Sequence, residues 1–214
     1  MAVTSSTPET YERLRAAILS GSLEPNERLV EADLVRSLEA SRGAVRGAIA
    51  RLDHEGLVVH ERNRGAKVRR VSLEEAVEIL EARAALEGIG AREAARRADP
   101  DAIARLRAVL ARMRTRLADG DLLATSELNG ELHARILRIA HHATVERLVE
   151  SLSSQLVRYQ YRTILIPGRA GASLAEHAAI LDALEMRDGD AAEAAMRAHL
   201  DRVTDALRTA GDGR

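Results

Sequence analysis

The chain has 214 residues, which is enough for one small domain and one of medium size. Aromatic side chains make up 1 % of the sequence and cysteine is absent, so the core must be aliphatic, and disulfides and thiolate metal sites are excluded. The net charge is -1, and no basic N-terminal segment leads into an apolar run, so we expect a cytoplasmic protein without a signal peptide or membrane span.

The first part of the chain predicts a winged helix-turn-helix. Its expected elements are three helices with apolar stripes at helical spacing, followed by two short strands, over residues 8–20, 31–38, 42–55, 57–59 and 66–71. Asn63-Arg64-Gly65, between the strands, is typical of a tight turn. Three helices followed by a hairpin form the winged helix-turn-helix order, and we place this domain at residues 1–71.

The remainder, residues 72–214, predicts an antiparallel all-helical bundle. Capping boxes at Ser72–Glu75, Ser173–Glu176 and Asp190–Glu193 mark the starts of three helices. The six expected helices cover residues 74–98, 100–117, 122–140, 144–162, 173–187 and 190–208. The fold class is therefore mainly α, with a winged helix-turn-helix before a helical bundle.

Positive charge is concentrated in one segment of this nearly neutral chain. Residues 41–70 hold eight basic and three acidic side chains, which gives the segment a charge of +5. A local basic block favours nucleic acid as a partner over a membrane. Basic residues also commonly just solvate a surface, so the charge is weak evidence by itself.

The helix expected over residues 42–55 carries groups suited to reading DNA. Arg42 and Arg46 lie one turn apart, away from the apolar stripe, and a guanidinium matches the two acceptors of guanine in the major groove. Ser41 caps this helix, whose first N–H groups can hold a phosphate, and Gly43 permits close approach. The alternative is a helix with two solvated arginines, and spacing alone leaves both interpretations open.

Three histidines on separate expected helices are candidates for a metal site. His133, His177 and His199 can converge inside a bundle, and Asn129 lies one turn before His133 on the same face. Imidazoles with an amide oxygen suit a divalent transition metal. Spacing alone favours the alternative, because separate helical histidines are mostly surface or hydrogen-bonded core residues.

The N-terminal domain resembles the winged-helix domain of the GntR family. The resemblance is carried by Gly21–Glu31, Ser41-Arg42 with Val45-Arg46, Arg51–Leu57 and Arg64–Val68. The chain departs from the family at Gly43, Ala44 and Glu39, which stand where Thr, Pro and Gly are usual, and these departures affect base preference more than fold. The resemblance and the charge pattern together give the candidate DNA contacts as Arg28, Ser41, Arg42, Gly43, Arg46, Arg62, Arg64, Gly65 and Lys67.

Residues 72–209 resemble the FadR C-terminal (FCD) effector domain of one GntR subfamily. The resemblance is carried by Glu81–Glu87, Asn129–His133, Glu176–Ile180 and Arg197–Leu200. Many members bind a metal through an Asp or Asn, a His four residues later and two further His. This implies a site for Zn, Ni, Co or Mn whose ligands are Asn129, His133, His177 and His199.

The same resemblance implies a small organic acid effector that reaches the metal, and homodimers that bind palindromic double-stranded DNA. A guanidinium can pair bidentately with such an acid. Arg83 is the first candidate, and Arg158 and Arg162, one turn apart, are the second choices. The alternative for each arginine is a surface salt bridge to a neighbouring glutamate.

We therefore expect a transcription regulator, not an enzyme, whose operator affinity changes when a carboxylic acid binds at a metal-containing helical domain. Two alternatives stay open. One is a metal-dependent enzyme with a nucleic-acid-binding domain, for which Glu131 or Glu176 would have to supply a general base. The other is a metal sensor, in which the metal itself is the signal.

Overall fold

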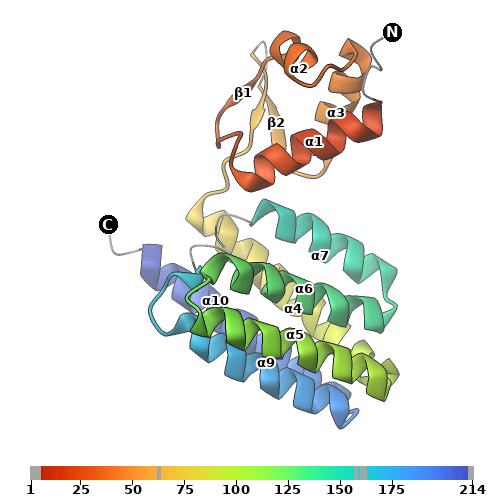
Figure 1. Cartoon of the computed structure of the whole chain (residues 1–214), viewed down its shortest axis with the longest axis vertical. Coiled ribbons are helices and arrows are strands. Elements are labelled where there is room, and N and C mark those ends of the chain that lie inside the picture. The colour runs from red at the N-terminus through yellow and green to blue at the C-terminus, as the bar shows by residue number, and fades with distance from the viewer. Residues whose placement is uncertain (1–5, 62–63, 157–158, 160–162, 212–214) are drawn as a thin grey trace. The chain divides into compact units, whose positions relative to one another are not determined.

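The computed structural model describes residues 6–61, 64–156, 159 and 163–211. The chain divides into two compact units, Met1–Val71 and Ser72–Arg214, which are described separately below (Figure 1). Within the described residues, no helix combines the length and the apolar character that a bilayer crossing requires.

The first unit is a winged helix-turn-helix. Its elements in chain order are α1 (Thr7–Ser20), β1 (Arg28–Leu29), α2 (Glu31–Ser37), α3 (Arg42–His54), β2 (Val58–Glu61) and β3 (Gly65–Val68). The strands form an antiparallel sheet in the order β1-β3-β2. The expected hairpin is present, but β1 was missed because two residues are too few to show an alternating pattern.

Apolar side chains from all three helices and the sheet form one core in this unit. Leu14 of α1, Val45 and Leu52 of α3, and Val58 of β2 are almost completely buried. Ser41 caps α3, because its hydroxyl accepts a hydrogen bond from the N–H of Ala44 at 3.1 Å. The core and this cap fix which side of α3 remains exposed.

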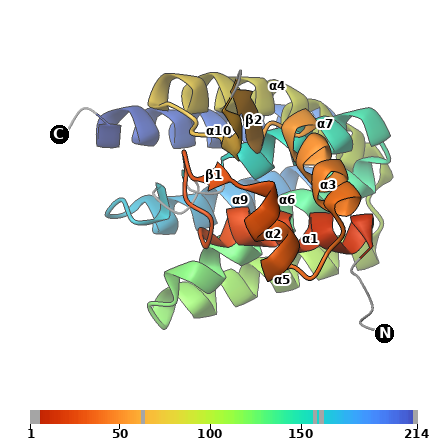
Figure 2. The same ribbon diagram turned by 90° about the horizontal axis from the view of Figure 1, so that it is seen from above.

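The second unit is an all-helical bundle, as expected. It consists of α4 (Leu73–Arg97), α5 (Pro100–Ala118), α6 (Leu122–Ala140), α7 (Ala143–Gln155), α9 (Arg169–Glu185) and α10 (Gly189–Gly211). The long helices α4 and α10 pack along each other, and α5, α6 and α9 complete the bundle (Figures 1 and 2). Its core includes Leu106, Leu132, Ile136 and Leu181, and so is aliphatic.

The fourth predicted helix was too long. It was expected over residues 144–162, but α7 ends at Gln155, and Leu156 is its C-cap. Near this end the side chains of Ser154 and Gln155 both donate hydrogen bonds to the carbonyl of Ser151. Such bonds between side chains and nearby backbone compete with the helical pattern.

The predicted start of the fifth helix and the predicted cap of the sixth were also wrong. Helix α9 begins at Arg169 and not at Ser173, because Gly168 takes a left-handed conformation at the N-cap (φ 78°). His177 is therefore in the third turn of α9 and not in the first. Helix α10 is capped by Asp188, whose carboxylate accepts from the N–H of Ala191 at 2.9 Å, so the expected box at Asp190–Glu193 does not form.

Candidate metal and DNA-binding sites

Three histidines from three helices meet in the interior of the bundle. His133 lies on α6, His177 on α9 and His199 on α10, and all three are buried. One ligand nitrogen from each lies within 4.8 Å of the others, and the Nε2 atoms of His133 and His177 are 3.2 Å apart. The fold thus brings together the three histidines that the sequence analysis selected.

Two glutamates, the buried Glu87 and the largely buried Glu176, orient two of these rings. Glu87 of α4 accepts a hydrogen bond from Nδ1 of His133 at 2.5 Å, and Glu176 of α9 accepts one from Nδ1 of His199 at 2.7 Å. Because a carboxylate only accepts, each bond places a proton on Nδ1, and Nε2 is then the nitrogen that can bind a metal. Carboxylate–histidine pairs of this kind are the usual outer shell of metal-binding histidines.

His177 has no such partner. Its Nδ1 is buried and makes no hydrogen bond to any described residue. Burial, followed by the charges of His199, His133 and Arg169, lowers the pKa of His177 well below 6.5. The pKa of His199 is likewise lowered by burial and by His133 and Arg169. Both imidazoles are therefore neutral at pH 7, which is the form that binds metals.

The spacing of two of these nitrogens, those of His133 and His177, fits a divalent transition metal. Two nitrogen ligands of a tetrahedral zinc at about 2.0–2.1 Å lie roughly 3.3 Å apart, close to the 3.2 Å between the Nε2 atoms of His133 and His177. Two neutral imidazoles gain little from facing each other at this distance unless a proton or a metal lies between their lone pairs. The donor set thus suits Zn, Ni, Co or Mn.

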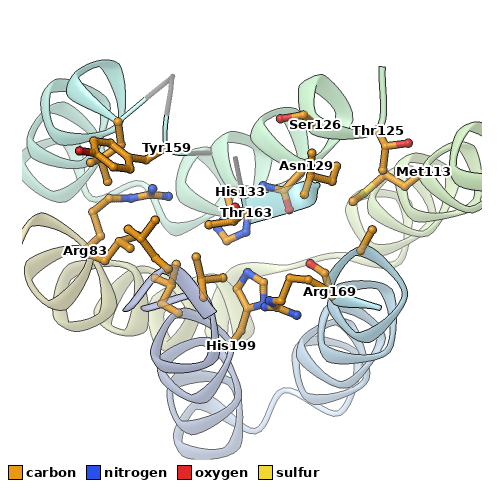
Figure 3. Close-up of a pocket in the computed structure, with 18 residues that line it drawn as sticks. Arg83, Met113, Thr125, Ser126, Asn129, His133, Tyr159, Thr163, Arg169 and His199 are labelled. Atoms are coloured by element: carbon orange, nitrogen blue, oxygen red, sulfur yellow. The ribbon is translucent and has the colours of Figure 1, made fainter. Parts of the chain in front are cut away.

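A cavity of about 70 Å³ lies beside this cluster, lined by His133, His199 and Asn129. Figure 3 shows Asn129 close to His133, with its polar end toward the cavity. The rest of the wall is mostly apolar and includes Leu80, Met113, Leu156, Leu200 and Val203. A small molecule with one polar end and a short apolar body matches this lining.

Arg83 lies at the edge of the same cavity, as Figure 3 shows. Its Nε and Nη2 atoms donate to Oε1 of Glu87 at 2.8 and 2.7 Å. Burial by itself would raise the pKa of Glu87, but the charges and hydrogen bonds of Arg83 and His133 lower it to about 2. Arg158 and Arg162, the second choices for an effector clamp, lie outside the described residues.

Arg169 and the roles of Glu87 and Glu176 were not predicted from the sequence. Arg169, in the first turn of α9, lines the cavity and donates to Glu176 from Nη2 at 2.7 Å, while its Nε is buried without a partner among the described residues. The capping-box interpretation of Glu176 hid this role. For Glu87, an arginine one turn earlier was the available signal.

Helix α3 presents its arginines to solvent, where DNA can reach them. Arg42 and Arg46 are exposed, as are Ser41 and Gly43. Nε of Arg46 donates to Oε2 of Glu31 at 2.8 Å, which orients the guanidinium without using its two terminal nitrogens. Within the described residues, Arg42 has no ion-pair partner.

The wing continues this basic surface. Nη2 of Arg28 donates to the carbonyl of Arg64 at 3.0 Å, and Lys67 pairs with Glu61 at 2.5 Å. Gly65 has a φ of +79°, which a residue with a side chain rarely adopts, and so permits the turn. Arg62 lies outside the described residues. A hollow between β1, α3 and the wing is lined by Arg28, Glu31, Arg46, His60 and Arg64.

A basic winged helix-turn-helix followed by a helical bundle with an internal cavity is the architecture of a DNA-binding transcription regulator. Two family models match the chain: residues 7–68 match the bacterial regulatory proteins of the gntR family, and residues 78–202 match the FCD domain. The chain therefore belongs to the GntR family and carries an FCD domain.

Similar proteins agree with this assignment. The HTH-type transcriptional repressor RspR of Escherichia coli (strain K12) is 28 % identical over 200 residues, which cover 94 % of this chain and 88 % of that protein. An uncharacterized HTH-type transcriptional regulator in an unstable DNA locus of Streptomyces ambofaciens is 30 % identical over 198 residues, covering 92 % and 83 %. The solved structure of E. coli McbR/YncC shares the fold, with a TM-score of 0.79 at 19 % identity and coverage of 97 % and 99 %. The family and these names are those of regulators, so the enzyme alternative is not retained.

Proposed function

We propose that this regulator binds a palindromic DNA operator as a homodimer, and that a small organic acid bound at a divalent metal changes its affinity for the operator. Residues 1–71 would supply DNA binding, and residues 72–214 would supply metal binding, effector binding and dimerisation. Asn129, His133, His177 and His199 would hold the metal, which supplies a Lewis-acidic contact for a carboxylate.

The metal site is supported chiefly by the convergence of three buried imidazoles, those of His133, His177 and His199, on one point. Two of the three rings are oriented by carboxylates, one of which, that of Glu87, is completely buried. Burying a charged group costs free energy that the packing of an apolar core does not require. The fourth candidate ligand, Asn129, borders the same cavity.

The position and lining of the cavity support the proposal that an effector binds there. It adjoins His133 and His199, so a bound molecule can touch both the metal and the wall. Arg83 and Arg169 are the described cations in its lining, and both are suited to carboxylates. An acid that fits one arrangement of these helices better than another would shift the population of that arrangement, and with it DNA affinity.

Elemental analysis for bound metal tests the proposed metal site. Elemental analysis should find near one metal per wild-type chain and little in His133→Ala, whereas the matched variant His60→Ala, on the exposed wing, should retain it. The absence of metal from all three proteins would overturn the metal site.

Fluorescence anisotropy of a labelled operator, obtained by selection from random DNA, measures DNA affinity and so tests whether an acid regulates it. Affinity should change when a small carboxylic acid is added to metal-loaded protein. If metal alone changes the affinity and acids do not, the protein is a metal sensor and the proposed effector is wrong.

A further inference from the structure

The charges around the cavity form two pairs that cancel. Arg83 is paired with Glu87, and Arg169 is paired with Glu176. None of the described residues that line the cavity is an aspartate or a glutamate. Imidazoles that bind a metal are neutral, so the polar wall of a metal-loaded site adds no net charge to that of the ion.

A divalent metal would leave this cavity with two positive charges in excess. Asn129 contributes an amide oxygen and no charge. Outside the described part of the chain, residues 157–158 and 160–162 include Arg158 and Arg162 and no acid, so they cannot supply the missing negative charge. Arg202, which approaches Glu176 at 3.7 Å from the exposed side, is also positive.

An uncompensated charge in a buried site is costly, by several kcal/mol per ion. The ligand that completes the site must therefore supply the negative charge that balances the metal. A monocarboxylate neutralises one of the two charges, whereas a dianion neutralises both. An aspartate at position 129 would remove one charge and reduce this requirement to a monoanion.

The positive groups are also separated in space. Glu87 lies between His133 and Arg83, at 2.5 Å from Nδ1 of the first and 2.7 Å from Nη2 of the second. A guanidinium has five N–H donors, and Glu87 accepts those of Nε and Nη2, so Arg83 keeps donors for the cavity that it borders in Figure 3. Two separated positive centres suit two separated carboxylates better than one compact phosphate.

We propose that the effector is a short dicarboxylate bound as a dianion, with one carboxylate on the metal and the other on Arg83, and that Asn129 sets this preference over monocarboxylates. The proposal rests on the proposed function, because it takes the metal and the acid effector as given and adds the charge of that effector.

The test uses isothermal titration of the metal-loaded full chain at neutral pH with malonate and with malonamate, its monoamide. The two probes have the same shape and differ by one charge. Wild-type protein should bind malonate about tenfold more tightly or better, since one added charge interaction in a partly buried site readily exceeds the ~1.4 kcal/mol that tenfold represents. Asn129→Asp should reduce this ratio by about tenfold. Asn26→Asp, the same change on an exposed turn of the first unit, should leave it unchanged.

Metal content, measured before and after each titration, separates the possible failures. Equal affinity for malonate and malonamate with metal retained overturns the dianion preference and leaves the proposed function intact. Inorganic phosphate that binds as tightly as malonate overturns the two-point arrangement. If no metal is present, or no acid binds, the proposed function fails and this inference fails with it. The comparison of the two probes on wild-type protein stands even if Asn129→Asp does not fold.

Discussion

The carboxylate of Glu87 lies 2.5 Å from Nδ1 of His133, although the two residues are 46 positions apart in the chain. The same carboxylate holds Arg83 and is completely buried. Glu87 therefore joins helix α4 to a candidate metal ligand on α6 and also neutralises a buried arginine. Its removal should affect both stability and metal binding.

We expect Glu87→Gln to weaken metal binding by about 10- to 100-fold, because an amide is a poorer acceptor for the His133 N–H than a carboxylate. The free energy of unfolding should fall by about 3 kcal/mol, because Arg83 loses its counter-charge inside the protein. Competition with a metal indicator and denaturant unfolding measure the two effects. Glu93→Gln, on the same helix with exposed arginine partners, is the matched control. Equal metal affinity in wild type and Glu87→Gln would contradict the orienting role.

The metal-free protein should lose stability as the pH falls through 6.5. The pKa of His177 and the pKa of His199 are both lowered in the folded state by burial and by neighbouring positive charge, and they return to about 6.5 on unfolding. Between the folded and unfolded values the unfolded chain binds more protons, so unfolding becomes easier as protons are added. The loss is up to ~1.4 kcal/mol per pH unit for each histidine.

Denaturant titrations of chelator-treated protein, at neutral pH and about one unit below 6.5, measure this slope. The double variant His177→Gln with His199→Gln should flatten it. His141→Asn, which changes an exposed histidine in a left-handed conformation that Asn tolerates, should retain it. An equal slope in all three proteins would show that other groups control the acid sensitivity.

Helix type and order could be predicted because long apolar stripes dominate this sequence. The expected and observed bounds differ by one residue for α4 and α5 and are identical for α6, where Asp99-Pro100 and Asp119-Gly120 mark the breaks. The helix start that failed, at Ser173, and the cap that failed, at Asp190, both depended on capping boxes. Such a box is a four-residue pattern that also occurs inside helices, where its acid is free to pair elsewhere, as Glu176 does with His199.

The histidines of the candidate site could be selected by residue type and resemblance, whereas its supporting carboxylates could not. Glu87 and Arg169 reach the cluster from α4 and the start of α9, and this proximity depends on how the helices pack. Sequence spacing reports which residues share a helix face. It contains no information on which faces meet, so contacts between helices appeared only in the structure.

Gly90 should be essential for the packing of α4. A Cβ added there would overlap Cδ2 of Leu137 on α6, and because Leu137 is itself buried, its side chain has little room to move away. Gly90→Ala should therefore lower the free energy of unfolding by about 1–3 kcal/mol. Gly130→Ala, on α6 with no atom near its added Cβ, should instead raise it by about 0.5–1 kcal/mol through helix propensity. Denaturant unfolding of both variants measures the contrast, and effects of the same sign would contradict the packing argument.

Specific DNA binding should depend on the two exposed arginines of α3. Arg42→Ala with Arg46→Ala should weaken binding to the selected operator by about 1–3 kcal/mol for each lost base contact, and should reduce discrimination against scrambled DNA. The control Arg105→Ala with Arg138→Ala removes the same charge from an exposed surface of the second unit and should leave discrimination unchanged.

Anisotropy titrations at several salt concentrations distinguish base reading from phosphate attraction. Loss of a base contact lowers the ratio of operator to scrambled affinity, whereas loss of a phosphate contact weakens both and reduces the salt dependence by about one ion per contact. Glu31→Gln provides a finer test, because it keeps both arginines but weakens the bond that orients Arg46. If Glu31→Gln lowers the ratio and the α3 double variant lowers it further, α3 is the recognition helix. If the ratio of operator to scrambled affinity is unchanged in the double variant, α3 does not read the DNA sequence, and the wing becomes the candidate for this role.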